Sequence, residues 1–342
     1  MREFKVILIT FGFIIMVYTN LTVKYKDYPS FNNFTKTQKL VQQVGDGSII
    51  KRFDKTPIPK KQNDVICPHF LELKWAYGCP FNCSWCYLKG TFRFLPTKTA
   101  PHIKPMKKVE EHLLALFNET TNNGYPKEVL NTGEIADSLM FENNGNSFSK
   151  FIIPIFDSQK KHKVLFLSKS DRVNNLLNLK INGSPIMSFT LNASYVSGKW
   201  EKKAPPVRRR ISAARQLCEV GYPVRIRIDP IIPIRNWEIH YKELIDNIFS
   251  NFEPERITLG SLRGLQSTIN NATDKSWVKY LSETSNWGKK IDFNLRFKMY
   301  KTIIDYLKDT YNYKHVAMCK ETIAMWNKLK MNWRKIKCNC IL

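Results

Sequence analysis

The sequence predicts an α/β fold, a partial (β/α)6 barrel of the TIM type with an N-terminal extension and a helical C-terminal tail. From residue 69 onward, short apolar segments with strand character alternate with amphipathic segments of helical length. Turn residues lie at both ends of the fifth predicted strand, residues 224–228. Gly221-Tyr222-Pro223 precedes it, and Asp229-Pro230 is expected to end it. Alternating strands and helices imply a parallel sheet, and functional residues gather at the carboxyl ends of its strands.

The predicted strands are short and rich in apolar residues, and they cover 70–76, 128–131, 163–168, 186–191, 224–228 and 256–259. The predicted helices have apolar residues at helical spacing, and they cover 106–122, 147–160, 171–179, 206–220 and 238–251. Two further helices are expected near 292–310 and 320–333. The barrel should therefore span residues 67–265, followed by a helical extension over 266–342.

The N-terminal 66 residues fall into two parts. Residues 24–66 are polar and contain glycine and proline breakers, so they predict an irregular lead-in with one helix over Thr35–Val44. Residues 1–23 contain an uncharged apolar stretch from Val6 to Val23, close to the shortest length that can span a membrane. Three alternatives remain open for it: a membrane anchor, a buried element, or an upstream start with Met16 as the true initiator.

The charge balance favours a polyanionic partner. The 342 residues include 54 Lys and Arg against 29 Asp and Glu, a net charge of +25. A content of 43% hydrophobic and 24% charged residues excludes a disordered chain, a collagen-like chain and a polytopic membrane protein. Nucleic acid or an anionic membrane fits the charge, and the alternative is a bias of base composition.

Three of the eight cysteines, Cys79, Cys83 and Cys86, form a C-x3-C-x2-C motif directly after a predicted strand. Eight cysteines are too few for a disulfide scaffold, so the motif indicates metal binding in a reducing, cytoplasmic compartment. Structural zinc sites and ordinary iron–sulfur clusters take four ligands, whereas three thiolates leave one position open for a substrate or cofactor. The alternatives are a zinc ion with Cys67 or His69 as a distant fourth ligand, or a coincidental spacing of the cysteines.

The motif, with the aromatic Trp85 before its last cysteine, resembles that of the radical S-adenosylmethionine superfamily. The resemblance implies that the three cysteines hold a 4Fe-4S cluster, whose fourth iron binds the amino and carboxylate groups of S-adenosyl-L-methionine. Reductive cleavage of that cofactor would give a 5′-deoxyadenosyl radical, which abstracts hydrogen from the substrate. The superfamily also uses the partial barrel predicted above.

Further segments from about residue 66 to the C-terminus look like the spore photoproduct lyase family. They are Cys86-Tyr87-Leu88, Asn131-Thr132-Gly133-Glu134 with Asp137-Ser138-Leu139, Leu167-Ser168-Lys169, the run Ser188–Asn192, the run from Gly221-Tyr222-Pro223 to Asp229–Pro233, and Met318-Cys319-Lys320-Glu321. By this resemblance, Trp85 would lie against the adenine, and Gly133 and Glu134 would meet the methionyl amino group. Ser168, Lys169 and Asn192 would contact the carboxylate and the ribose, since Lys supplies a point charge and Asn both donates and accepts hydrogen bonds.

The same resemblance gives candidate catalytic residues: Tyr87, Glu134, Arg227 and Asp229. Arg227 and Asp229 should face the pocket from the fifth strand, and the alternative is a structural ion pair. The lyase of the family carries a hydrogen-donating cysteine in the loop after the second strand, where Glu134 is expected here. No cysteine occurs between Cys86 and Cys218. Cys338 or Cys340 could substitute if the tail folds over the barrel mouth; otherwise they are a surface or structural pair.

The densest basic run follows the fourth strand and should lie on the rim of the pocket. Its candidate nucleic-acid-binding residues are Lys199, Trp200, Lys202, Lys203, Arg208, Arg209 and Arg210. Lys and Arg would neutralise phosphates, and Trp200 would stack or wedge against a base. The amides at the start of the helix after Pro205-Pro206 could also hold phosphate.

The first functional hypothesis is a radical S-adenosylmethionine enzyme that acts on a nucleobase in DNA, for repair or modification. It would need a reductant such as flavodoxin or ferredoxin and would act on an extruded nucleotide. The second hypothesis is the same chemistry on a small molecule or peptide. The third is a non-catalytic iron–sulfur protein that binds nucleic acid.

Overall fold

One curved sheet organises the computed structural model, which describes residues 5–10, 13–18, 20–121, 123–142, 147–335 and 337–342. In spatial order its strands are β20 (Val316–Met318), β16 (Arg256–Ser261), β15 (Val224–Ile231), β13 (Pro185–Leu191), β12 (Lys163–Ser168), β11 (Val129–Asn131), β7 (Leu71–Leu73), β5 (Ile50–Arg52), β4 (Asn33–Val44) and β3 (Val23–Ser30). From β20 to β7 all pairings are parallel. The predicted mixed α/β class with a large, mostly parallel sheet is confirmed.

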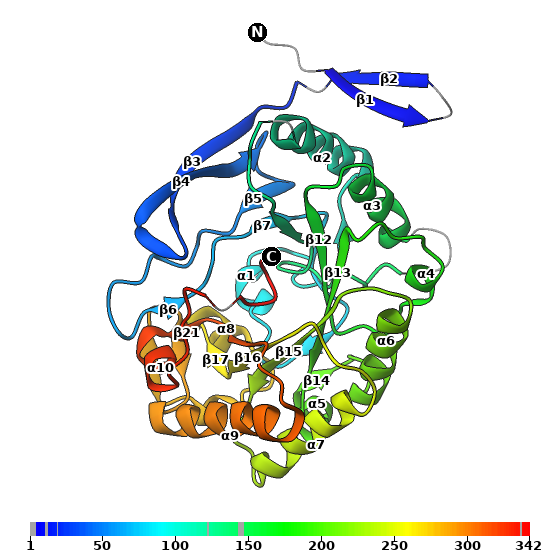
Figure 1. Cartoon of the computed structure of the whole chain (residues 1–342). Helices are drawn as coiled ribbons and strands as arrows, with labels where there is room; N and C mark the ends of the chain where they lie inside the picture. The colour runs from blue at the N-terminus through cyan, green and yellow to red at the C-terminus, as the bar shows by residue number, and fades with distance from the viewer. Residues whose placement is uncertain (1–4, 11–12, 19, 122, 143–146, 336) are drawn as a thin grey trace.

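Helices ring the outside of the sheet, except for the short α1 and α8, which are drawn inside the ring, and the C-terminus lies near the centre of the ring (Figure 1). They are α1 (Leu88–Thr91), α2 (Met106–Thr121), α3 (Phe148–Asp157), α4 (Asn174–Leu177), α5 (Ser194–Trp200), α6 (Val207–Glu219), α7 (Trp237–Phe249), α8 (Gln266–Asn271), α9 (Phe293–Tyr311) and α10 (Ile323–Lys328). Each predicted helix after residue 100 has a counterpart here, whereas α1, α5 and α8 are too short for a periodic signal.

Short strand pairs complete the fold. They are β1 (Lys5–Thr10) with β2 (Phe13–Tyr18), β8 (Ala76–Tyr77) with β10 (His102–Ile103), β9 (Asn82–Cys83) with β14 (Glu201–Lys202), β6 (Val65–Ile66) with β21 (Glu321–Thr322), and β19 (Gly288–Lys290) with both β17 (Arg263–Gly264) and β18 (Glu283–Ser285). A 3-10 turn covers Val278–Tyr280. The C-terminal extension over 266–342 is therefore not purely helical, because β18 to β21 belong to it.

The predicted helix over Thr35–Val44 is wrong, because this segment is strand β4. It pairs antiparallel with β3 on one side and with β5 on the other. The hydroxyl of Tyr125 also accepts a hydrogen bond from the amide of Val41 at 2.9 Å. Residues 24–52 thus extend the edge of the main sheet, whereas residues 53–64 contain no helix or strand, as expected of an irregular lead-in.

The apolar N-terminal stretch forms the antiparallel hairpin β1–β2, which lies beside the ring of helices (Figure 1). Among the described helices, none is both long enough and apolar enough to cross a membrane. Residues 1–4, 11–12 and 19 lie outside the described part of the chain. The three alternatives for residues 1–23 therefore stay predictions.

Strand β15 does not end at Asp229-Pro230 as predicted; it continues to Ile231. The Asp229-Pro230 bond is cis, and the pairing with β16 shifts register between Ile228 and Ile231. Proline cannot donate to the ladder, so its place at a register shift agrees with its chemistry. The extension carries Asp229 within the strand rather than in a loop.

A buried ion pair fixes the N-terminal strands to the barrel. Arg52 of β5 is 2% exposed, and its Nη2 lies 2.6 Å from Oε1 of Glu128. Its Nε donates to the carbonyl of Val41 at 2.7 Å. We expect Glu128→Ala to lower the free energy of unfolding by about 3–5 kcal/mol, because the guanidinium stays buried without its partner.

Urea unfolding followed by circular dichroism measures this loss. Lys26→Ala is the matched control, since Lys26 is half-exposed and lies 3.9 Å from Asp54. Such an exposed pair contributes about 0–1 kcal/mol. Equal losses in the two variants would show that the buried pair does not secure the N-terminal strands.

Candidate active site

The three motif cysteines lie in the segment that follows β8, and pairing with strand β14 fixes the position of this segment. Cys83 belongs to β9, where it pairs with Glu201 of β14. The amide of Cys79 donates to the carbonyl of Thr99 at 2.8 Å. Cys79, Cys83 and Cys86 line one cavity of about 300 Å³, and no described cysteine forms a disulfide. The backbone contacts hold all three thiols at the wall of this cavity.

Residues at successive strand ends form the opposite walls of the cavity. Gly133 and Glu134 follow β11, and Ser168 ends β12. The structure thus brings together most of the predicted site. The predicted residues that line the cavity are Cys79, Cys83, Trp85, Cys86, Tyr87, Gly133, Glu134, Ser168, Lys169, Arg227 and Asp229.

Gly133 lets the ends of β11 and β12 approach closely. A Cβ atom built on Gly133 would lie 2.6 Å from Cβ of Leu167 and 2.9 Å from Oγ of Ser138. Any larger residue would push these two strand ends apart, and the cavity wall would shift with them. The predicted Gly-Glu element therefore has a steric reason to carry glycine at this position.

Asp137 belongs to a segment of the family resemblance, Asp137-Ser138-Leu139, that was given no role in the site, and it positions the residues after β12. Its carboxylate accepts hydrogen bonds from Oγ of Ser168 at 2.7 Å and from the amide of Lys169 at 2.8 Å. Burial raises the pKa of Asp137, and these hydrogen bonds oppose the rise. The ammonium of Lys169 lies 3.7 Å from Glu201, which also contacts Arg210 at 2.6 Å. Glu201 therefore links Lys169 to the strand pair that carries Cys83.

The donor set agrees with an iron–sulfur cluster. Burial raises the pKa of all three thiols, that of Cys83 to about 12, while the charge of Lys169 opposes the rise for Cys83 and Cys86. Raised pKa values mean that deprotonating these buried thiols costs free energy. A bound metal would compensate this cost, because cysteine binds metal as a thiolate. No three His, Cys, Asp or Glu side chains within the described ranges are grouped as ligands of a single metal ion. A cluster instead binds each thiolate through a different iron, so three thiols around one cavity fit it.

Asp229 is paired with Arg263 rather than with Arg227. The two guanidinium nitrogens of Arg263 lie 2.9 and 2.8 Å from the two oxygens of Asp229. Arg227 instead donates to Sγ of Cys340 at 3.0 Å, and its buried Nε has no hydrogen-bond partner. Arg263 and Cys319 also line the cavity, and sequence reasoning missed both. The Met318–Glu321 segment of the family resemblance contained Cys319, whereas nothing in the sequence singled out Arg263.

The predicted contact of Asn192 with a ribose is not supported. Asn192 is fully buried and does not line the cavity. Its side-chain amide donates to the carbonyl of Pro230 at 2.8 Å, and its oxygen accepts from the hydroxyl of Tyr241 at 2.9 Å. Both polar ends are therefore used inside the protein, where they fix the turn after β13 against β15.

Two members of the predicted basic run are wrong as nucleic-acid contacts. Trp200 is 0% exposed and donates through Nε1 to Ser276 at 2.8 Å, so it cannot stack on a base. Arg210 is 0% exposed and forms the buried pair with Glu201. The other members are exposed: Lys199, Lys202, Lys203, Arg208 and Arg209.

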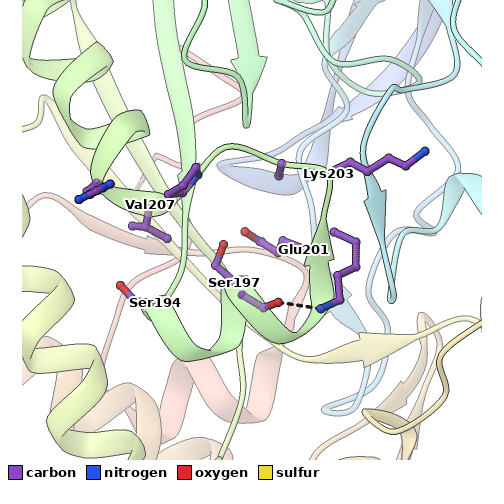
Figure 2. Close-up of a pocket in the computed structure, with 10 residues that line it drawn as sticks. Ser194, Ser197, Glu201, Lys203 and Val207 are labelled. Atoms are coloured by element: carbon purple, nitrogen blue, oxygen red, sulfur yellow. Dashed lines mark hydrogen bonds between the residues drawn. The ribbon is translucent and has the colours of Figure 1, made fainter.

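A second pocket, at the start of α6, contains part of this basic run. Lys202, Lys203 and Arg208 line it together with residues of α5. Figure 2 shows Ser197 and Glu201 between Val207 of α6 and Lys203 of the preceding loop. Because Lys202 pairs with Asn82 through β14 and β9, this pocket adjoins the cysteine segment.

The family model described as "Spore photoproduct lyase" matches residues 71–263, more than half of the chain. The chain belongs to the spore photoproduct lyase family. This family is part of the radical S-adenosylmethionine superfamily, so the resemblance on which the site residues were chosen is confirmed.

Curated members of the spore photoproduct lyase family match part of the chain. The spore photoproduct lyase of Bacillus subtilis (strain 168) is 27% identical over 176 residues, which cover 52% of this chain and 50% of that protein. The enzyme of Geobacillus sp. (strain Y412MC61) is 23% identical over 178 residues, which cover 52% of this chain and 50% of that protein. The chain therefore spans about half the length of the curated relatives that it matches.

Solved structures of spore photoproduct lyase share the fold over a longer stretch. One, complexed with dinucleoside spore photoproduct, superposes with a TM-score of 0.62 at 16% identity, over 78% of this chain and 79% of that one. A mutant with bound AdoMet and dinucleoside spore photoproduct gives a TM-score of 0.60 at 17% identity, over the same shares of both chains. At these identities the likeness establishes the fold alone.

Proposed function

We propose that this protein is a radical S-adenosylmethionine enzyme that acts on a nucleobase in DNA, with chemistry like that of spore photoproduct lyase. One observation carries the proposal: the three motif cysteines line a single cavity together with Gly133, Glu134, Ser168 and Lys169, four of the residues expected to contact the cofactor. The bound AdoMet and dinucleoside photoproduct in the related structures support both the cofactor and the substrate class.

In this proposal the residues of the cavity have separate tasks. Cys79, Cys83 and Cys86 hold the 4Fe-4S cluster, and Lys169 offers its charge to the carboxylate of S-adenosyl-L-methionine. When bound, these two groups supply a 5′-deoxyadenosyl radical that removes a hydrogen atom from the substrate. Trp85 contributes an apolar wall that excludes water, packed at a centroid distance of 5.9 Å from the ring of Trp200.

The test is anaerobic reconstitution with iron and sulfide, reduction with dithionite, and chromatography of the products. We expect 5′-deoxyadenosine to be released, and ultraviolet-irradiated DNA to increase the amount. Stimulation by DNA separates this proposal from the same chemistry on a small molecule or peptide. A colourless, zinc-loaded protein, or a brown protein that releases no 5′-deoxyadenosine, would contradict it.

The exposed basic residues at α6 are the proposed contacts to the DNA backbone. Lys203 and Arg208 line the pocket beside the cysteine segment, so a strand held there would lie next to the radical site. We expect Lys203→Ala and Arg208→Ala each to reduce the slope of log affinity against log salt by about 1, since each residue neutralises one phosphate.

Fluorescence anisotropy of a labelled oligonucleotide at several salt concentrations measures this slope. Lys301→Ala is the control, because Lys301 lies on the exposed side of α9 and pairs with Asp305. A slope that changes equally in all three variants would mean that the pocket at α6 does not hold the backbone.

A further inference from the structure

Exposed apolar side chains are concentrated directly after the last motif cysteine. Among the described residues, seven large hydrophobic side chains are exposed, and three of them, Tyr87, Phe94 and Leu95, lie within residues 87–95. Phe94 is the most exposed of the seven, at 82%, ahead of Ile239 at 56%. Single exposed apolar residues are ordinary, whereas a group of them beside a cavity marks an interaction site.

Successive turns fix the loop that carries Phe94. The amide of Leu95 donates to the carbonyl of Phe92, and the amide of Lys98 donates to the carbonyl of Leu95, both at 3.0 Å. At the end of the loop, the carbonyl of Thr99 accepts a hydrogen bond from the amide of Cys79 at 2.8 Å. The loop is therefore tied to the segment that carries the motif cysteines, and it holds the ring of Phe94 out in solvent.

The loop begins at the wall of the cavity. Leu88 and Thr91 of α1 line the cavity, and Thr91 is also exposed, so the cavity opens to solvent beside it. Phe94 follows three residues later, and three residues of chain span at most about 11 Å. A Cβ atom built on Gly90 would lie 2.7 Å from the backbone of Ser267, so α1 packs tightly against α8. The exposed ring is thus fixed near the mouth of the cavity.

Arg93 lies against the ring of Phe94 and adds positive charge. Its Cζ lies 4.1 Å from the ring centroid, and its Nη1 donates to the carbonyl of Gly90 at 2.6 Å. The surrounding segment 73–109 contains seven Lys and Arg and no Asp or Glu. A guanidinium on one face of the ring leaves the other face for a flat partner. Positive charge beside an exposed aromatic ring fits nucleic acid, whose phosphates and bases match both features.

A nucleobase in duplex DNA must leave the base stack before it can enter a cavity. Proteins that open a stack insert an apolar side chain, such as Phe or Leu, between base steps. We propose that Phe94 is such a wedge: it enters the duplex at the place that the target nucleotide leaves, and Arg93 keeps its ring in position. This inference rests on the proposed function, and it assigns duplex DNA, rather than a single strand, as the substrate.

Fluorescence of 2-aminopurine tests the wedge without turnover. The reconstituted, unreduced protein is mixed with a duplex oligonucleotide in which this base lies beside a T·T mismatch, and its fluorescence rises when it loses a stacking neighbour. We expect the wild type to raise the signal roughly threefold or more at saturating protein, and Phe94→Ala to leave it nearly unchanged, because alanine is too short to enter the stack. Phe94→Leu should keep most of the rise, since leucine still fills the gap.

Ile239→Ala is the matched control, because Ile239 is exposed on α7 and does not line the cavity. It should raise the fluorescence as the wild type does. Equal rises in the wild type and in Phe94→Ala, or no rise in the wild type, would overturn the inference.

Turnover on two substrates separates this inference from the proposed function. The dinucleoside spore photoproduct has no stack to open, whereas a duplex that carries the same photoproduct does. We expect Phe94→Ala to release roughly tenfold less 5′-deoxyadenosine than the wild type with the duplex, and the same amount with the dinucleoside. An equal loss on both substrates, or no loss with the duplex, would overturn the inference. A wild type that releases 5′-deoxyadenosine with neither substrate would refute the proposed function instead, and the fluorescence test would still decide the role of Phe94.

Discussion

A Cys83→Ala variant is expected to lose the broad absorbance near about 400 nm of the reconstituted protein and to release roughly 100-fold less 5′-deoxyadenosine than the wild type, or none. Cys83 is 7% exposed and lies in the β9–β14 pair, so no other thiol of the motif can move into its place. Two thiolates bind only two irons of the proposed cluster. Iron content, absorbance and product release are measured on the same sample.

Cys218→Ala is the matched control for this loss. Cys218 lies on α6, is partly exposed and does not line the cavity. It should keep the iron content and product release of the wild type. If both variants bind iron equally and release 5′-deoxyadenosine equally, the C-x3-C-x2-C motif does not hold the cluster.

A Lys169→Met variant is expected to bind S-adenosyl-L-methionine roughly 10- to 100-fold more weakly, which corresponds to about 1.4–2.7 kcal/mol. Lys169 lines the cavity and, in the proposed function, faces the carboxylate of the cofactor. The fold should survive, because Glu201 keeps Arg210 at 2.6 Å after the ammonium is removed. Isothermal titration of the reconstituted protein with S-adenosyl-L-methionine measures the affinity.

Two further variants show whether the charge itself matters. Lys169→Arg should recover part of the affinity, since it keeps the charge but changes its shape. Lys199→Met, at an exposed position outside the cavity, should bind the cofactor as the wild type does. Unchanged affinity in Lys169→Met would remove Lys169 from the proposed cofactor site.

The sequence predicted the parallel strands and the cavity cysteines because both signals are local. Each strand of the barrel is a short apolar run, and the cysteine spacing lies within eight residues. Segment 35–44 was predicted as a helix but is a strand, because pairing with β3 and β5 decides its conformation. In a polar sequence, such pairing produces no periodic pattern of apolar residues from which the strand could be predicted. Predictions were therefore correct where the signal lies within a short stretch of sequence, and wrong where distant strands decide the conformation.

The basic run shows a second reason for error. Seven candidate residues are close in sequence, but the helical turn of α6 exposes Arg208 and Arg209 and directs Arg210 to Glu201. Arg263 and Cys319 reach the cavity from segments far from the cysteine motif, so only the fold could bring them together. Charge and motif predicted the kind of site, whereas the inward or outward direction of each side chain needed the structure.

In the proposed function, a radical formed at this cavity abstracts hydrogen from a nucleobase in DNA. The most direct test is isotope transfer: the reconstituted, reduced enzyme is incubated with ultraviolet-irradiated DNA that contains perdeuterated thymidine, and the released 5′-deoxyadenosine is analysed by mass spectrometry. We expect 5′-deoxyadenosine that carries deuterium from the DNA. Release of 5′-deoxyadenosine without deuterium would contradict it.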